Sequence, residues 1–363
     1  MIPSDIHAVD VTWLSQVMGT EVTHFELNQI GQGVGIMGDI FRTTLTYAQA
    51  AENHPASVVI KLPSSFPENR EQGVALGMFN AEVRFYKELA GRVTTGLPAI
   101  YHAEIDAAGS DFVIVMEDLC DLQMVNQSDG LEVDQAHAAL NVLGKIHAAW
   151  WDDVEGDDVN WIAAMNGPRI EFVDSLMPAM LAQFREGFAQ YLPPGGLEVY
   201  ELFTGNYLKL TSTMAARSPW TLVHQDFRVE NMMFAQDGSE RVVVIDWQGI
   251  GRGPGAYDVA YILSGSMDTK LRQANEPALL DTYLNSLQDA GVTNYSSEQL
   301  QQDYALSQFM GGLATSMFIG GGLDLSNERG VALCATMSSR HVQAAIDHGG
   351  VDFLQSVIDA YDG

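Results

Sequence analysis

Residues 222–234 read LVHQDFRVENMMF, and residues 242–251 read VVVIDWQGIG. In these segments Asp226 and Asn231 lie five positions apart around a predicted turn, and Asp246 ends a strongly apolar strand. A carboxylate at the end of a buried strand is unfavourable unless it pairs with a cation or binds a metal ion. The pattern therefore predicts a positively charged partner for Asp246.

These polar side chains suit a site for a metal ion and a phosphorylated ligand. Carboxylate and amide oxygens are hard ligands for Mg²⁺, which needs few protein groups when phosphates supply the others. We therefore predict that Asn231 and Asp246 are Mg²⁺ ligands and that Asp226 orients a substrate hydroxyl and accepts its proton. His224 is expected to support this loop through backbone hydrogen bonds. Zinc is disfavoured, because no nearby cysteine or second histidine completes a ligand set.

The chain changes character along its length. Up to about residue 117 it is mostly strand-like, with buried-strand patterns in ASVVIKLP (56–63) and DFVIVMEDL (111–119) and one clear helix pattern between them. Later residues are mostly helical, apart from the β-rich region that holds Asp226 and Asp246. The 363 residues exceed the usual size of one hydrophobic core. We predict an α+β chain with two lobes, residues 1–117 and 118–363.

HQDFRVEN (224–231) with the downstream IDWQ (245–248) resembles the H-x-D-x-x-x-x-N motif and the following aspartate of the kinase-like fold. The chain is most similar to the aminoglycoside phosphotransferase and choline kinase-like family, and through residues 245–263 to its ecdysteroid-kinase-like (CHK kinase-like) branch. The resemblance implies a protein-kinase-like bilobal fold. Its β-rich N-terminal lobe would bind the nucleotide, and its mostly helical C-terminal lobe would hold the catalytic and substrate-binding residues.

The resemblance also implies roles for single residues. It assigns Asp226 as the catalytic base and Asn231 and Asp246 as Mg²⁺ ligands. It further implies that Asp258 braces the catalytic loop from a following helix. Gln225 departs from the pattern, because many relatives have glycine there; we expect its side chain to narrow the loop and to leave the catalytic positions unchanged.

The N-terminal half supplies candidates for holding ATP. Lys61 is one of five lysines and closes a β-branched strand, so it needs a counter-charge. Glu82, on the helix pattern that follows, is the matching carboxylate in the family that the chain resembles, and Glu71 is the alternative partner. An exposed Glu82 on a solvent-facing helix stripe is the simpler alternative.

Two further segments are candidates for contacts with the nucleotide. Gly31, Gly33 and Gly35 would let backbone amides approach phosphates, as in the glycine-rich loop of kinases, although they equally suit an ordinary hairpin turn. VMEDL (115–119) resembles the segment that connects the lobes of kinases, where backbone groups of Glu117 and Leu119 would bind adenine. A plain buried strand end is the alternative for this segment.

The composition limits the class of partner and the cellular location. The net charge of −29 disfavours nucleic acid and anionic membranes, because these partners require clustered basic residues. The acidic residues either attract a cationic substrate or form an ordinary solvated surface. With no signal-like N-terminus and no apolar run of bilayer length, we expect a cytoplasmic location. Cys120 and Cys334 are interpreted as buried thiols in a reducing compartment.

The predicted activity is ATP- and Mg²⁺-dependent transfer of a γ-phosphoryl group to a hydroxyl of a small molecule. The acceptor is either an apolar, steroid-like alcohol or an aminoglycoside or choline-like amine, and the sequence leaves the oligomeric state open. A nucleotide-binding pseudokinase is the non-catalytic alternative, which the retained Asp226, Asn231 and Asp246 disfavour. A protein kinase is disfavoured because D-F-G and A-P-E are missing, and a metal hydrolase would not require Lys61 and Glu82.

Large apolar residues of the helical half are candidates for an acceptor pocket or, more simply, for the core. They are Trp150, Trp151, Trp161, Phe184, Phe188, Phe309, Met310, Met317 and Phe318.

Overall fold

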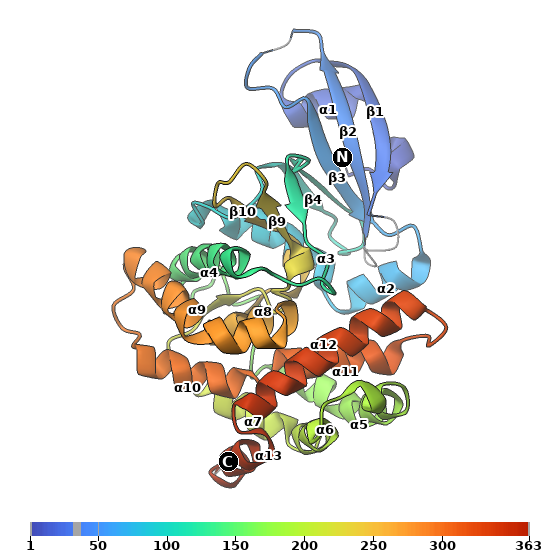
Figure 1. Ribbon diagram of the computed structural model, residues 1–363. Coiled ribbons are helices and arrows are strands. Elements are labelled where there is room, and N and C mark those ends of the chain that lie inside the picture. The colour runs from blue at the N-terminus through green and yellow to red at the C-terminus, as the bar shows by residue number, and fades with distance from the viewer. Residues whose placement is uncertain (1, 32–37, 50, 362–363) are drawn as a thin grey trace. The chain divides into compact units, whose positions relative to one another are not determined.

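A computed structural model describes residues 2–31, 38–49 and 51–361. The chain separates into an N-terminal unit, Met1–Leu122 with Val243–Gly249, and a C-terminal unit, Gln123–Val242 with Ile250–Gly363 (Figure 1). The sequence places a single boundary between residues 117 and 118. In the structure the first division falls after Leu122, and the short segment that contains Asp246 is counted with the N-terminal unit.

The N-terminal unit is built on a five-stranded antiparallel sheet with the strand order β1-β2-β3-β5-β4. Strand β3 is central and β-branched, and its buried Val58 and Ile60 alternate with Val59, which is partly exposed. Lys61 pairs with Ile40 on one side and Ile114 on the other, so it lies in the middle of the sheet. The strands are β1 (Val22–Ile30), β2 (Gly38–Tyr47), β3 (Ser57–Pro63), β4 (Ile100–Ile105) and β5 (Phe112–Glu117).

Three α-helices belong to this unit: α1 (Val11–Met18), α2 (Pro67–Ala75) and α3 (Met78–Arg84). Helix α3 buries Phe79, Glu82 and Val83, which the three- and four-residue spacing of a helix places on one face. A π-helical turn, Phe85–Leu89, continues α3 and buries three more side chains. Glu82 is thus carried inward by the same face that packs the apolar residues.

The C-terminal unit is mostly helical. Its long helix α5 begins with Pro168 in the first turn, and α9 begins after the cap Asp268, whose side chain accepts backbone hydrogen bonds. The helices are α4 (Val133–Ala148), α5 (Pro168–Phe188), α6 (Gly196–Thr204), α7 (Tyr207–Ala215), α8 (Ala256–Ser266), α9 (Thr269–Asp289), α10 (Ser297–Ser307), α11 (Gly311–Gly322), α12 (Glu328–Asp347) and α13 (Gly350–Asp359).

Short strands position the segment that contains Asp226. Strands β7 (Ala163–Ala164), β11 (Gly251–Gly253) and β8 (Thr221–Val223) form a sheet in that order, and β8 ends directly before His224. A second sheet has the order β10-β9-β6. Its strands are β6 (Leu122–Met124), β9 (Met232–Ala235) and β10 (Val242–Val244). The turn between β9 and β10 contains Gly238 with a positive φ of 83°, a conformation that glycine adopts without strain.

Most of the candidate pocket residues belong to the helical core. Six of them are buried: Trp150, Phe184, Phe188, Phe309, Met310 and Met317. Cys334 is buried as expected, whereas the prediction for Cys120 is wrong, since its side chain is exposed. Cys120 directly follows the buried Leu119, at the point where the chain leaves the sheet. Among the described helices, none is long and apolar enough to cross a membrane.

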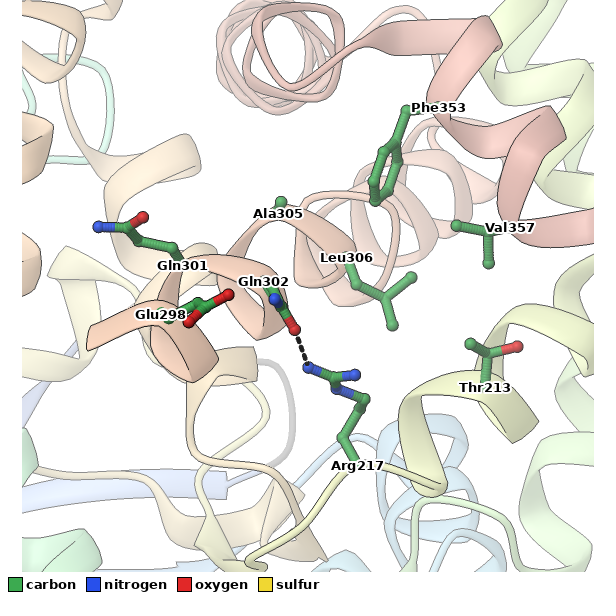
Figure 2. A pocket seen from close by; sticks show the side chains of 9 residues that line it. All are labelled: Thr213, Arg217, Glu298, Gln301, Gln302, Ala305, Leu306, Phe353 and Val357. Atoms are coloured by element: carbon green, nitrogen blue, oxygen red, sulfur yellow. Dashed lines mark hydrogen bonds between the residues drawn. The ribbon is translucent and has the colours of Figure 1, made fainter. Parts of the chain in front are cut away.

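A pocket of about 480 Å³ lies among α7, α10 and α13 of the C-terminal unit (Figure 2). Its wall combines apolar groups such as Leu306 and Phe353 with polar ones such as Arg217 and Gln302. Arg217 is already paired with Asp303 and donates a hydrogen bond to Gln302 at 3.0 Å. None of the predicted site residues lines this pocket.

A buried charge network connects α9, α10 and α12. Arg272, nearly fully buried, donates to Glu276 at 2.6 Å and also pairs with Asp347. Tyr304 and His348 contact Glu276 at 2.9 and 3.0 Å. Burial favours the protonated acid, but the hydrogen bonds and charges of His348 and Arg272 outweigh it and lower the pKa of Glu276 from 4.5 to about 2.

We expect Glu276→Gln to remove a stabilisation that depends on pH. Because folding lowers this pKa, the contribution is complete above pH 4.5 and is lost as pH falls toward 2. Its size near neutral pH is about 2 kcal/mol after allowance for solvent screening. Urea unfolding of both proteins between pH 7 and pH 3 checks this. If the free energies of unfolding of the two proteins fall in parallel as pH decreases, Glu276 is not the source of this pH dependence.

Candidate active site

In the N-terminal unit, Lys61 lies between two carboxylates. Its Nζ donates to Glu82 Oε1 and Oε2 at 2.9 and 2.8 Å and to Asp246 Oδ1 at 3.0 Å. The Lys61 and Glu82 side chains are 8% and 1% exposed, whereas that of Asp246 is 38% exposed. The structure thus contains the pair of Lys61 with Glu82 that was expected, and the alternative partner, Glu71, is exposed.

In this cluster the Lys61 ammonium is stabilised by two carboxylates, which repel each other. Burial opposes the Lys61 ammonium, but the nearby Asp246 and Glu82 outweigh burial and raise the pKa of Lys61. Burial raises the pKa of Glu82. The charge of Lys61 and the hydrogen bonds from Lys61 and Gln248 act in the opposite direction and lower it. Lys61 therefore stays protonated, as a group that binds phosphate oxygens must be.

The segment after β10 is fixed against α3. The Trp247 ring stacks on Phe85 with 4.0 Å between centroids, and Gln248 Nε2 donates to Glu82 Oε2 at 3.2 Å. Asp246 has a positive φ of 67°, which is unfavourable for a residue with a Cβ and is held here by the surrounding packing. Sequence reasoning did not identify Gln248 as a site residue, although it lies within the quoted IDWQ.

In the C-terminal unit, Asp258 holds the backbone that leads into the loop containing Asp226. It accepts the N–H of His224 at 2.6 Å and that of Gln225 at 3.0 Å, and His147 Nε2 lies 3.2 Å from the same carboxylate. Asp258 is fully buried and belongs to α8. This is the brace that the sequence resemblance implies. The contribution of His147, from α4, was missed.

His224 supports the loop through its ring. Its Nδ1 accepts the backbone N–H of Asp226 at 3.3 Å, which places the ring proton of a neutral imidazole on Nε2. The ring is fully buried and lies edge-on to Phe227. This geometry matches the structural role that was expected for His224.

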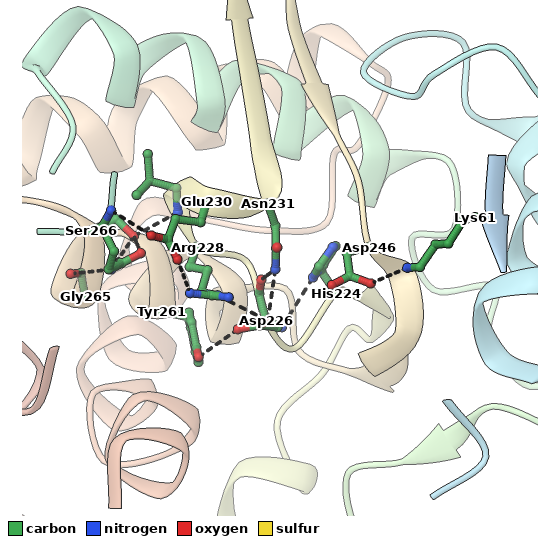
Figure 3. A network of polar contacts seen from close by, with 12 residues as sticks. Lys61, His224, Asp226, Arg228, Glu230, Asn231, Asp246, Tyr261, Gly265 and Ser266 are labelled. Atoms are coloured by element: carbon green, nitrogen blue, oxygen red, sulfur yellow. Dashed lines mark hydrogen bonds and ion pairs between the residues drawn. The ribbon is translucent and has the colours of Figure 1, made fainter. Parts of the chain in front are cut away.

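The Asp226 carboxylate is the centre of a hydrogen-bond network (Figure 3). Asn231 Nδ2 donates to the backbone oxygen of Asp226 at 2.8 Å and to its Oδ2 at 2.9 Å. Arg228 Nε lies 3.4 Å from Oδ2, and Arg228 also donates to Glu230 at 2.6 Å. Tyr261 donates to Oδ1 at 3.0 Å. Because the amide nitrogen of Asn231 is engaged, its Oδ1 is the atom suited to ligate a cation.

The fold leaves room for the side chain of the unusual Gln225. Its φ is 66°, the left-handed conformation for which glycine is best suited. Its side chain occupies the space beside Gly251, where an added Cβ would overlap the Gln225 amide. The glutamine therefore fits because residue 251 has no side chain.

The glycine-loop prediction lies mostly outside the described residues. Gly31 follows β1 with a positive φ of 69°, the left-handed conformation that favours glycine. Gly33 and Gly35 belong to the residues that the structure does not describe.

The predicted adenine contacts lie after β5. The Glu117 N–H donates to the Ala99 carbonyl at 2.8 Å, so the carbonyl of Glu117 is its candidate group for adenine. The Leu119 carbonyl accepts from Leu122 at 3.0 Å, which makes the N–H of Leu119 the corresponding donor. These contacts with a nucleotide remain predictions.

Asp118, between these two residues, was not identified from the sequence. Its carboxylate accepts from Arg42 Nε at 3.0 Å and from Ser57 Oγ at 2.6 Å. Its side chain is only 3% exposed. These contacts from β2 and β3 fix the segment that contains the predicted adenine contacts.

The donor set suits magnesium. Among the described residues, no group of three or more His, Cys, Asp or Glu side chains is arranged to hold a metal ion. Mg²⁺ bound together with phosphates needs only one or two protein ligands. In the N-terminal unit the partly exposed Asp246 carboxylate is a hard ligand of this kind, and in the C-terminal unit the Asn231 amide oxygen is another.

A model of the ecdysteroid kinase-like family matches residues 32–293. The chain belongs to this family. All of the predicted site residues except Gly31 fall inside the matched range. A search of curated proteins gives no match to this ecdysteroid kinase-like protein.

Solved structures resemble this family member in fold. A protein described as an aminoglycoside phosphotransferase from Ralstonia eutropha JMP134 is 14% identical, with a TM-score of 0.57 over 93% of this chain and 97% of that one. A choline kinase from Cryptosporidium parvum Iowa II is 12% identical, with a TM-score of 0.53 over 92% of this chain and 93% of that one. The amicoumacin kinase hAmiN, in complex with AMP-PNP, Ca²⁺ and Ami, is 13% identical, with a TM-score of 0.52 over 92% of this chain and 94% of that one. The fold is therefore the protein-kinase-like α+β fold.

We expect Lys61→Met to destabilise the protein by about 3–5 kcal/mol, because Glu82 would be left buried without its cation. The double variant Lys61→Met with Glu82→Gln should recover most of this loss, since it leaves no uncompensated charge. Urea unfolding at pH 7 measures both. A double variant as unstable as the single one would show that the lost stability is not due to the unpaired Glu82.

Proposed function

We propose that this ecdysteroid kinase-like protein transfers the γ-phosphoryl group of MgATP to a hydroxyl group of a small molecule. The observation that carries the proposal is the buried Lys61 ammonium, held between Glu82 and Asp246. It combines a fixed cation for nucleotide phosphates with a carboxylate that suits Mg²⁺. The hAmiN complex, which holds AMP-PNP and Ca²⁺, supports a nucleotide with a divalent ion.

Each unit has its own part in the proposed reaction. Lys61 binds phosphate oxygens, and Glu82 keeps its ammonium in place. Asp246 and Asn231 are the residues that would hold Mg²⁺, and the ion would supply positive charge to neutralise the phosphates. Backbone groups of Glu117 and Leu119 bind adenine.

Asp226 is the proposed base. Its side chain is 37% exposed, so a substrate hydroxyl can reach it, while Asn231 fixes one carboxylate oxygen. It orients the hydroxyl oxygen toward the γ-phosphorus and takes the hydroxyl proton as the new O–P bond forms and the bond to ADP breaks. The protonated carboxylate then returns the proton to solvent.

The surroundings of Asp226 favour a neutral alcohol as the acceptor. Although the chain has only 18 Lys and Arg residues, Arg228 contacts Asp226 directly. On α5 of the same unit, Phe172 and Leu176 are 56% and 38% exposed and share one helix face. These features suit an apolar, steroid-like alcohol better than a cationic amine.

Kinases for amines are the second candidate. The net charge of −29 suits a cationic acceptor, and the solved structures of similar fold include a choline kinase and a protein described as an aminoglycoside phosphotransferase. A pseudokinase that binds nucleotide without transfer is less consistent with an Asp226 held so specifically by hydrogen bonds.

We expect Asp226→Ala to lower turnover by at least about 10³-fold while MgATP affinity changes little, because it removes the group that orients the hydroxyl and spares the nucleotide contacts. Asp237→Ala, in the exposed turn between β9 and β10, is the matched control and should keep wild-type turnover. An ADP-release assay and calorimetry measure the two quantities. Wild-type turnover of Asp226→Ala would refute the proposal.

A screen of acceptors tests the substrate class. We expect ATP consumption to rise with steroid or terpenoid alcohols and to stay at the background level with choline-like amines, aminoglycosides and sugars. Mass spectrometry of the product locates the phosphate on a hydroxyl. Selective use of a cationic amine would instead establish the second candidate.

A further inference from the structure

The two carboxylate oxygens of Asp226 are held by different parts of the fold. Oδ2 receives Asn231 Nδ2 at 2.9 Å and lies 3.4 Å from Arg228 Nε, both from the same loop. Oδ1 receives the Tyr261 hydroxyl at 3.0 Å, and Tyr261 belongs to α8. The contact from Tyr261 therefore ties the carboxylate to a helix outside its own loop (Figure 3).

Helical spacing makes α8 a support for both the backbone and the side chain of this loop. Asp258 and Tyr261 are three residues apart and so project from the same face. Asp258 accepts the backbone N–H groups of His224 and Gln225, whereas Tyr261 contacts the Asp226 side chain. The rotation of the carboxylate is thus set relative to the same helix that sets the chain path.

The Tyr261 ring is itself immobilised by His341. The rings meet edge-on with 5.4 Å between centroids, and both residues are at most 2% exposed. Ser264 donates to the Ala260 carbonyl at 2.5 Å, so it accepts the Nδ1 proton of His341 at 2.7 Å. Burial and, secondarily, Arg340 lower the pKa of His341 to about 3, so the ring packs as a neutral group at ordinary pH.

Helix α11 closes the other side of this imidazole. A Cβ on Gly312 of α11 would overlap the His341 ring, and one on Gly265 of α8 would do the same. The ring is therefore enclosed by two helix backbones, which leave it no room to turn. Tyr261, packed on this ring, presents its hydroxyl in one orientation.

We infer that Tyr261 is a positioning residue whose hydroxyl fixes the rotation of the Asp226 carboxylate for transfer to the acceptor. The assignment rests on the function proposed above. In Tyr261→Phe the carboxylate keeps its Asn231 contact but loses the restraint on Oδ1, so fewer bound substrates are aligned with the γ-phosphorus. Tyr261 keeps its own proton throughout, because burial and the charge of Asp226 raise its pKa well above 10.

Tyr200 provides a matched control. It is also a fully buried tyrosine, on α6, and its hydroxyl pairs with Ser316 Oγ of α11 at 2.8 Å. Tyr200→Phe therefore removes one buried hydroxyl together with its hydrogen bonding, as Tyr261→Phe does, but in the helical core. Urea unfolding of both variants separates a general loss of stability from an effect on Asp226.

The test measures ADP release from MgATP with the alcohols of the acceptor panel and with water alone. Tyr261→Phe should lower kcat by about 10- to 100-fold, the range expected for a lost hydrogen bond to a charged group, with KM for MgATP within about twofold of wild type. Tyr200→Phe should leave kcat within about twofold.

Equal kcat values for the two variants would overturn the inference and leave the proposed function intact. A loss of MgATP affinity in Tyr261→Phe that accounts for the lower turnover would overturn it too. If wild-type protein and Asp226→Ala release ADP at the same rate, the proposed function is refuted, and the inference with it.

Discussion

The arrangement of the loop that contains Asp226 depends on the hydrogen bonds of one buried carboxylate. Asp258 has no exposed surface, so its oxygens require donors that stay in place. Two of these donors are backbone N–H groups, of His224 and Gln225, and a third is the ring of His147. Because backbone groups satisfy it, the carboxylate determines the path of the chain directly before Asp226. Thr221 strengthens this link, since its hydroxyl donates to the backbone oxygen of His147.

The N-terminal unit also contains a buried carboxylate, which is compensated by a side-chain cation. Glu82 is as deeply buried as Asp258, but it is compensated by Lys61 and by the amide of Gln248. Lys61 is shared with the more exposed Asp246, so the ammonium has one partner inside the protein and one that faces solvent. The Lys61 ammonium can therefore exchange its contact with Asp246 for the oxygens of a phosphate, while Glu82 continues to hold it.

Much of the fold and part of the site were predictable from local sequence. The β-branched run that ends at Lys61 and the helical spacing around Glu82 predict elements that the structure contains, and Asp258 followed from the family resemblance. Other contacts depend on packing between distant segments. His147 meets Asp258 from another helix, and the short segment with Trp247 packs on Phe85 although the chain positions are far apart. The same is true of Cys120, whose exposure depends on where the chain leaves the sheet.

Tyr261 is an intermediate case. Once Asp258 is assigned to the brace, the three-residue spacing on a helix places position 261 on the same face. The contact with Asp226 Oδ1 still requires the loop to fold back over that face, which no local pattern specifies. Arg228 lies within the quoted catalytic motif, yet its pairing with both Asp226 and Glu230 depends on side-chain orientation.

Gln225 and Gly251 have a consequence for how such a loop changes during evolution. The left-handed residue of the loop, Gln225, carries a side chain, whereas Gly251 on the facing strand β11 has none. The space between them is therefore filled from the loop alone. A relative with glycine at the loop position would have an empty space at this point that a side chain on the strand could fill. The two positions form a compensating pair, and we expect their sizes to co-vary inversely across the family.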